Sequence, residues 1–219
     1  MKVGITGSPQ SGKTTLYRLL TGSRPGSGVS GVGVMEIPDD RVLTLSKIFE
    51  PSKTTYARID LVDIQHQKGQ KLLNEIRNLD ALIVVIGSFM GEPGVRDSID
   101  FLDSLRTEFY VADLSSVENR LEKLHSHKAK PVSQMEVPFL EKCKERLDQE
   151  LSLKGVEFSA HETDFLRNFA FYTLKPMILA LNLSEEHLLS KAYPGIEEIR
   201  HLADTLDYEM TLFSGAVEE

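Results

Sequence analysis

The sequence has a single cysteine, no long apolar run and no excess of positive charge. The lone Cys143 excludes an internal disulfide and fits a reducing compartment, the cytoplasm. The longest purely apolar run is Ala81–Ile86, whereas a membrane-spanning helix needs about 20 such residues, so no span is expected. The stretch from Met1 to Ile5 is too short for a secretory signal and favours a strand. The net charge of −8 argues against a protein that acts mainly by non-specific binding to phosphate backbones.

The remaining composition is that of an ordinary soluble chain, with 41% hydrophobic and 26% charged residues. Its 219 residues allow one domain, or one domain with an extra piece. Strand and helix patterns alternate along the first part of the chain. Strands are expected at 1–6, 32–37, 56–64 and 82–86, and helices at 13–20, 41–49 and 70–79. This alternation predicts a layered α/β fold with a mainly parallel sheet.

After about residue 97 the pattern becomes helical. Helices are expected at 99–109, 111–126, 137–153 and 162–171, with a polar, basic break at 125–131. Two amphipathic helices joined by a short polar turn predict an antiparallel helical hairpin. The α/β pattern then resumes with strands at 177–181 and 210–213 and helices at 185–190 and 196–205. We therefore expect an α/β domain at 1–108 and 174–219, with a hairpin inserted at 109–173.

The strongest chemical signal follows the first strand. The segment from Gly7 to Thr14 matches G-x-x-x-x-G-K-[ST] between a strand and a helix, which is typical of a phosphate-binding P-loop. Glycines let backbone N–H groups wrap the β-phosphate, Lys13 adds a cation, and the Thr14 hydroxyl can ligate Mg²⁺. The predicted nucleotide-binding residues here are Gly7, Ser8, Pro9, Gln10, Ser11, Gly12, Lys13, Thr14 and Thr15.

Three further elements fit a nucleotide site. Asp63 ends a strand and can hold the hydration shell of Mg²⁺, although Asp also commonly ends strands as a turn former. GTPases usually place Asn-Lys-x-Asp after the fifth strand, where this chain has Asn182-Leu183-Ser184-Glu185. A longer carboxylate at Glu185 puts strict guanine selection in doubt, and Ser184 also fits as the N-cap of the next helix. The small residues Ser214, Gly215 and Ala216 resemble the loop that backs the base.

These motifs together resemble the YchF or Obg-like ATPase family of P-loop NTPases. The resemblance extends over nearly the whole chain. It includes the segments Val32–Asp39, Val62–Ile64, Glu75–Ala81, Ala112–Leu114 and Leu174–Pro176, and the Asn-x-x-Glu motif at 182–185. It implies a G domain with an inserted coiled-coil hairpin, use of ATP as well as GTP, and association with ribosomes.

The chain also departs from the family pattern at the switches. His66 stands where switch II has Gly, and Ser27 aligns with the switch I threonine that is a second Mg²⁺ ligand. Gln67 falls where Ras-like enzymes keep a water-positioning Gln, and it is a candidate catalytic residue with His66; both are equally well interpreted as solvent-facing loop residues. The family's catalytic histidine has no counterpart in 89–97, and the chain stops before the family's C-terminal TGS domain.

The sequence therefore favours a nucleotide-dependent switch that binds ATP or GTP with Mg²⁺ and hydrolyses it slowly. The alternative is a degenerate nucleotide-binding or scaffolding module without significant hydrolysis. A small-molecule kinase is disfavoured, because the segment after the fourth strand offers few arginines for a phosphate lid. The hairpin tip, with Lys123, Lys128 and Lys130, is a candidate contact for RNA or the ribosome, or simply an exposed turn. The preferred base and the oligomeric state stay open.

Overall fold

The computed structural model describes residues 1–23, 32–64, 69–190 and 192–218. The chain forms two compact units. The first, the sheet unit, comprises residues 1–67, 78–100 and 176–219. The second, the hairpin unit, comprises residues 68–77 and 101–175. Within the described ranges, no helix is both long and apolar enough to cross a membrane.

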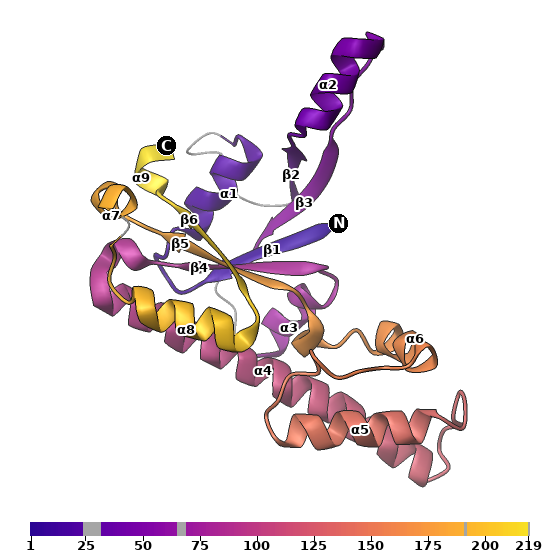
Figure 1. Cartoon of the computed structure of the whole chain (residues 1–219). Helices are drawn as coiled ribbons and strands as arrows, with labels where there is room; N and C mark the ends of the chain where they lie inside the picture. Colours follow the sequence, from indigo (N-terminus) through magenta and orange to yellow (C-terminus); the bar gives the residue numbers. More distant parts are fainter. Residues whose placement is uncertain (24–31, 65–68, 191, 219) are drawn as a thin grey trace. The chain divides into compact units, whose positions relative to one another are not determined.

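The sheet unit is built on a six-stranded sheet in the order β2-β3-β1-β4-β5-β6 (Figure 1). Neighbouring strands pair in parallel, except that β2 and β3 are antiparallel. The strands are β1 (Lys2–Gly7), β2 (Val32–Ile37), β3 (Ala57–Asp63), β4 (Ala81–Ile86), β5 (Met177–Asn182) and β6 (Glu209–Phe213). This mostly parallel sheet with helices confirms the α/β fold expected from the alternating pattern.

Apolar side chains hold the central strands in place. The strand β4 is buried along almost its whole length, as expected for a parallel strand with both faces covered. On one face of the sheet, Ile5 and Val85 pack with Leu16 and Tyr17 of α1 (Lys13–Thr21). The loop from β1 to α1 therefore starts and ends on rigid, buried elements.

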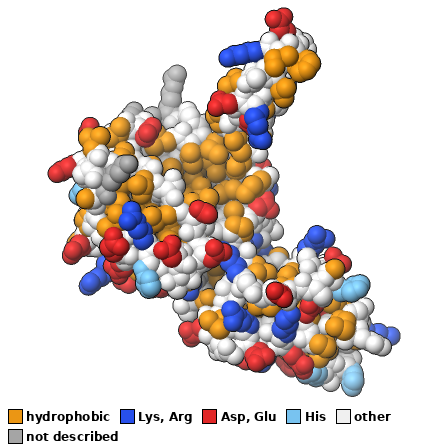
Figure 2. Space-filling view, in the orientation of Figure 1, with side chains coloured by type: hydrophobic (Ala, Val, Ile, Leu, Met, Phe, Trp, Pro, Cys, Tyr) orange, Lys and Arg blue, Asp and Glu red, His pale blue; other side chains and the backbone are white. Residues whose placement is uncertain are grey.

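The helix α2 (Asp40–Phe49) lies at the end of the β2–β3 pair (Figure 1). Its N-terminus is capped by Asp39, whose carboxylate accepts a hydrogen bond from the backbone N–H of Arg41 at 2.8 Å. None of its residues is buried, and Ile48 and Phe49 are exposed. Figure 2 shows hydrophobic side chains gathered on this helix and over part of the sheet. Further helices of the sheet unit are η1 (Ser88–Met90), α7 (Glu185–Ser190), α8 (Ile196–Leu206) and α9 (Gly215–Glu218).

A helical hairpin forms the second unit. Its helices are α3 (Gln70–Arg77), the part of α4 (Gly91–His125) from residue 101 onward, α5 (Glu136–Asp148), α6 (Ala160–Phe169) and η2 (Tyr172–Leu174). The two expected helices at 99–109 and 111–126 are one continuous helix. Glu118 of α4 pairs with Lys144, and Arg120 pairs with Glu136, so α4 and α5 run in opposite directions.

The hairpin has its own apolar core. Val117 and Leu121 of α4 pack with Phe139, Leu140 and Cys143 of α5. Cys143 is fully buried, and burial raises the pKa of its thiol to about 12, so it behaves as a core residue.

The expected helix at 137–153 is too long. The helix α5 ends at Asp148, and Glu150 adopts a left-handed conformation (φ 56°). Leu151 continues the helical spacing of the buried Leu140, Cys143 and Leu147, yet it lies beyond the end of α5 and is 39% exposed.

Candidate functional site

The loop between β1 and α1 contains two residues with a positive φ angle. Gly12 lies in the left-handed region (φ 98°), and Gln10 also has a positive φ of 58°. A side-chain carbon at Gly12 would collide with the amide of Asn182. Only glycine satisfies both this backbone conformation and this close approach. The loop therefore leads directly into the N-terminus of α1, where backbone N–H groups and the helix dipole favour an anion.

Lys13 folds back over the loop. Its ammonium donates hydrogen bonds to the backbone carbonyls of Ser8 (2.8 Å) and Gly7 (3.1 Å). Burial lowers the pKa of Lys13, and the nearby carboxylate of Asp63 offsets part of that effect. The cation is thus held at the loop by weak neutral acceptors, which phosphate oxygens can replace with stronger, charge-assisted bonds.

Thr14 and Asp63 form an oxygen-rich corner beside Lys13. The Thr14 hydroxyl donates a hydrogen bond to Asp63 Oδ2 at 3.1 Å. The other carboxylate oxygen, Oδ1, is buried and has no hydrogen-bond partner among the described residues. Hard divalent cations such as Mg²⁺ prefer oxygen donors of this kind. No cluster of three or more His, Cys, Asp or Glu side chains suited to a metal occurs in the described part of the chain.

Asn182 connects the loop to the end of the sheet. Its Nδ2 donates to the carbonyl of Ser11 (3.1 Å), and its Oδ1 accepts from the backbone N–H of Gly215 (2.9 Å). The side chain is buried, so its donor and acceptor hold two loops at a fixed spacing. The next residues start α7, where Ser184 Oγ accepts a hydrogen bond from the backbone N–H of His187 at 3.3 Å. Ser184 is therefore an N-cap, which is one of the two interpretations left open by the sequence.

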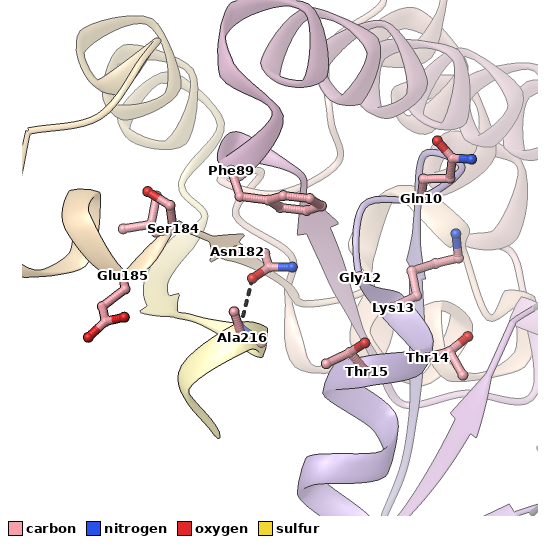
Figure 3. Close-up of a pocket in the computed structure, with 12 residues that line it drawn as sticks. Gln10, Gly12, Lys13, Thr14, Thr15, Phe89, Asn182, Ser184, Glu185 and Ala216 are labelled. Atoms are coloured by element: carbon pink, nitrogen blue, oxygen red, sulfur yellow. Dashed lines mark hydrogen bonds between the residues drawn. The ribbon is translucent and has the colours of Figure 1, made fainter. Parts of the chain in front are cut away.

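A cavity of about 560 Å³ opens between these segments. Gln10 and Lys13 lie at one end and Ser184 and Glu185 at the other, with Phe89 between them (Figure 3). The lining residues are Gln10, Gly12, Lys13, Thr14, Thr15, Phe89, Asn182, Leu183, Ser184, Glu185, Gly215 and Ala216.

Most of the predicted binding residues line this cavity. The exceptions are Gly7, Ser8, Pro9, Ser11 and Ser214, which belong to the same two loops but are not in the lining. Ser11 and Ser214 are fully buried and support the loops from behind. Ser27, His66 and Gln67 lie outside the described residues, so their predicted roles stay predictions.

Sequence reasoning missed Phe89. This residue lies on η1 directly after β4, and its ring is 42% exposed at the cavity. The sequence does contain a feature that could have identified Phe89. It is an aromatic residue just beyond the carboxyl end of a buried parallel strand, and ligands of open α/β sheets bind at those ends.

Proteins named ribosome-binding ATPase YchF are similar to this chain over most of its length. The Bacillus subtilis protein is 27% identical over 243 residues, covering 100% of this chain and 66% of the relative. The Escherichia coli O157:H7 protein is 28% identical over 226 residues, covering 92% and 61%. The chain thus spans less than two-thirds of these relatives' length. These similarities confirm the resemblance to the YchF family. No protein-family model matches the chain.

A solved structure shares the fold. The YchF GTPase of Schizosaccharomyces pombe superposes with a TM-score of 0.81 at 22% identity, covering 100% of this chain and 66% of that chain. The fold of this chain is therefore one already known from a solved structure.

Proposed function

We propose that this chain, a relative of the YchF proteins over most of its length, is a nucleotide-dependent switch that binds ATP or GTP with Mg²⁺ and hydrolyses it slowly. The observation that carries the proposal is the cavity of about 560 Å³ with Lys13 and Thr14 at one end and Ser184 and Glu185 at the other (Figure 3). A nucleoside triphosphate also has two distinct ends: charged phosphates, which suit Lys13, and a planar base, which would lie toward the other end of the cavity.

The phosphate end is served by the loop and by α1. Lys13 exchanges its bonds to the carbonyls of Gly7 and Ser8 for phosphate oxygens, while the loop N–H groups wrap the β-phosphate. Thr14 and Asp63 would hold the Mg²⁺, with Asp63 Oδ1 free to accept a hydrogen bond from a metal-bound water. A bound Mg²⁺ would supply positive charge that offsets the negative charge of the phosphates. Ser27 is the proposed additional ligand.

The part of the cavity proposed to bind the base combines apolar side chains, Phe89 and Ala216, with the fixed amide of Asn182, which we call the polar frame. The Phe89 ring at the cavity offers a face for stacking on a purine, and the Ala216 methyl adds a small contact. Both polar atoms of the Asn182 amide already have protein partners, so this side chain holds the frame in place. Glu185 remains the candidate that senses the base. This set of contacts accommodates either purine.

Hydrolysis is the second part of the proposal. His66 and Gln67 are the candidate groups that orient the attacking water, since they follow Asp63 in the switch II position. The alternative function, a nucleotide-binding or scaffolding module without significant hydrolysis, is favoured by one observation. His66 replaces the family glycine that donates its N–H to the γ-phosphate, and a side chain there disfavours the required backbone conformation.

Ribosome association is proposed from the relatives' name and from the hairpin tip. Lys123, Lys128 and Lys130 are exposed at the tip, and the segment 123–135 contains no acidic residue. Glu136, which follows, is buried and paired with Arg120. The segment 123–135 is therefore locally basic, which suits a phosphate backbone of RNA. The hairpin at 109–173 would act as the inserted contact domain, in the cytoplasm.

Calorimetry with ATP, GTP, ADP and GDP, each with and without Mg²⁺, tests nucleotide binding. We expect dissociation constants in the micromolar range and tighter triphosphate binding with Mg²⁺. Absence of heat for every nucleotide at millimolar concentration would reject the proposal. Phosphate release at saturating nucleotide then separates the two functions: a rate above the protein-free blank that Lys13→Ala abolishes supports the enzyme, and a rate equal to the blank supports the module without hydrolysis.

Co-sedimentation with ribosomal subunits at low salt tests the partner. We expect the wild-type chain to pellet with subunits, and the triple variant Lys123→Ala, Lys128→Ala, Lys130→Ala to remain in the supernatant. The matched control removes three exposed lysines elsewhere, Lys47, Lys53 and Lys71, and should pellet like the wild type. Equal loss in both triple variants would reject the tip as the contact.

A further inference from the structure

A fully buried hydroxyl joins the loop after β1 to two other segments of the sheet unit. Ser98, near the start of α4, has no exposed surface. Its Oγ donates to the carbonyl of Gly94 at 2.8 Å and accepts from the backbone N–H of Gly87 at 3.1 Å. It also lies 3.0 Å from the Oγ of Ser8, a residue of the P-loop.

The direction of these bonds follows from the number of protons. A serine hydroxyl has one proton to donate and two lone pairs to accept with. The Ser98 proton is directed to Gly94, so Ser8 must be the donor in the bond between the two hydroxyls. The bonds from Ser8 and from the Gly87 N–H then occupy both lone pairs. The Ser98 hydroxyl is therefore saturated, and loss of it leaves two donors unpaired in a buried place.

The three segments pack closely around this hydroxyl. A side-chain carbon at Gly94 would collide with the Gly87 carbonyl and lie 2.6 Å from Met90 Cβ. One at Gly87 would lie 3.1 Å from the Cα of Ser11 in the P-loop. The first turn of α4, the end of β4 and the P-loop thus pack backbone against backbone, with the Ser98 hydroxyl as their shared polar contact.

Ser8 matters for the phosphate end of the cavity. It is 3% exposed, and its carbonyl accepts the shorter of the two hydrogen bonds from Lys13, at 2.8 Å. The same carbonyl accepts from the backbone N–H of Ser11 at 3.3 Å. The position of Ser8 therefore sets both the turn of the loop and the resting place of the Lys13 ammonium.

We propose that Ser98 is a positioning residue for the P-loop: its hydroxyl fixes Ser8, and through Ser8 it keeps the loop in the conformation that wraps phosphate. This inference rests on the proposed function, because it assigns a role within the same site. Without the hydroxyl, the loop occupies its binding-competent conformation for a smaller fraction of the time. The apparent dissociation constant rises by the inverse of that fraction.

The main test compares Ser98→Ala with Ser88→Ala. Ser88 is equally buried, but its hydroxyl bonds to the Pro194 carbonyl (3.3 Å) and not to the P-loop. We expect Ser98→Ala to weaken binding of nucleoside di- and triphosphates about tenfold, as for loss of one buried hydrogen bond, with nucleoside monophosphate affinity unchanged. Ser88→Ala should bind all three as the wild type does. Equal effects of the two alanines, or equal loss for mono- and triphosphate, would overturn the proposal.

A double-mutant cycle tests the route through Ser8. Ser8→Ala should produce the same phosphate-dependent loss, and combining it with Ser98→Ala should add almost nothing, because both remove the same contact. Additive losses would show that Ser98 acts by another route. Ser8→Ala also serves if Ser98→Ala does not fold, because it leaves the bonds of Ser98 to Gly87 and Gly94 intact.

Hydrogen exchange in the nucleotide-free protein separates this inference from the proposed function. We expect faster exchange of the backbone amides of residues 8 and 10–12 in Ser98→Ala than in Ser88→Ala. Unchanged exchange there would overturn the positioning role, whatever the nucleotide affinity. The wild type could bind no nucleotide while exchange at the loop is still faster in Ser98→Ala. In that case the proposed function fails, and Ser98 positions the loop without a role in phosphate binding, which overturns that part of the inference.

Discussion

Acidic side chains in the two units have opposite surroundings. In the sheet unit, Asp63 has one oxygen bonded to Thr14, and its other oxygen is buried without a partner among the described residues. In the hairpin unit, both oxygens of Glu136 accept hydrogen bonds, from Arg120 and from the Val132 N–H.

Asp113 is the second example in the hairpin unit. Its two oxygens accept hydrogen bonds from the backbone N–H groups of Tyr172 (2.9 Å) and Thr173 (2.8 Å). Burial raises the pKa of Asp113 to about 6, against the effects of these bonds and of the Lys175 charge, which lower it. This carboxylate anchors the segment through which the chain leaves the hairpin.

The comparison teaches how a structural carboxylate differs from one available to a ligand. A buried polar atom costs free energy unless it is bonded, so side chains that serve the fold are satisfied within the fold. An unsatisfied carboxylate oxygen beside the P-loop is a place where a bound ligand can supply the missing partner. We therefore expect substitutions in the hairpin unit to change stability, and those in the cavity to change binding.

The largest binding effect is expected for Lys13→Ala. Loss of the only cation in the cavity lining should weaken triphosphate binding at least about a hundredfold, or about 3 kcal/mol, with little change in melting temperature. Calorimetry measures the affinity, and Lys47→Ala on the exposed α2 is the control. Tight triphosphate binding by Lys13→Ala would contradict the expectation that substitutions in the cavity change binding.

The largest stability effect is expected for Glu136→Ala. The Glu136 side chain is only 3% exposed and pairs with Arg120 at 2.7 Å, so its loss leaves a partly buried guanidinium unpaired and should cost about 3 kcal/mol. The matched control, Glu118→Ala, breaks a pair that is 50% exposed on the carboxylate side, and should cost less than about 1 kcal/mol. Urea denaturation measures both. Equal costs would contradict the distinction, and nucleotide affinity should not change in either variant.

The pH dependence of stability isolates Asp113. Because the folded pKa of about 6 lies above the unfolded value, the neutral form favours folding. That contribution is complete below about pH 4 and is lost as the pH rises through about 6, a change on the order of 3 kcal/mol. The free energy of unfolding of Asp113→Asn, measured across this range, should lack this fall. Parallel profiles for wild type and variant would mean that Asp113 does not titrate there.

Asp63→Asn tests whether the carboxylate with an unpartnered oxygen contributes to Mg²⁺-dependent binding. We expect the gain in triphosphate affinity on adding Mg²⁺ to shrink about tenfold, or about 1.4 kcal/mol, while Mg²⁺-free binding is unchanged. Stability should hold or rise, since an unpartnered buried oxygen loses its charge. A fall in stability as large as that of Glu136→Ala would place Asp63 with the structural carboxylates.

The smallest effect is expected for Phe89→Ala. Loss of stacking should weaken nucleotide binding by about 1 kcal/mol, roughly fivefold, equally for di- and triphosphates. The control is Phe49→Ala, because Phe49 is 73% exposed on α2 and outside the cavity lining. An unchanged affinity for Phe89→Ala would leave the base end to the polar frame alone.

Much of the site could be predicted because its residues act locally. The sequence from Gly7 to Thr14 carries its own backbone requirements, and Asp63 ends a strand that pairs directly with β1. The strands were predicted because a buried parallel strand needs a continuous apolar run, as in Ala81–Ile86.

What could not be predicted depends on residues far apart in the chain. The partners of Asp113 lie 59 and 60 residues away, and Ser8 meets Ser98 across 90 residues. No periodicity encodes such meetings. The predicted length of α5 was also wrong. Leu151 fits the helical spacing of the apolar residues, but the helix ends three residues earlier, at Asp148.

By itself, the sequence determined the order of strands and helices and the chemistry of the phosphate loop, because short-range sterics and apolar spacing set both. Only the tertiary structure decided which polar groups are satisfied. It gave Glu136 and Asp113 hydrogen-bond partners within the hairpin unit, left Asp63 Oδ1 buried without a partner among the described residues, and brought Ser98 Oγ to 3.0 Å from Ser8 Oγ of the P-loop. The reason is that hydrogen-bond satisfaction is a property of the packed chain, in which each donor must find an acceptor once water has been excluded.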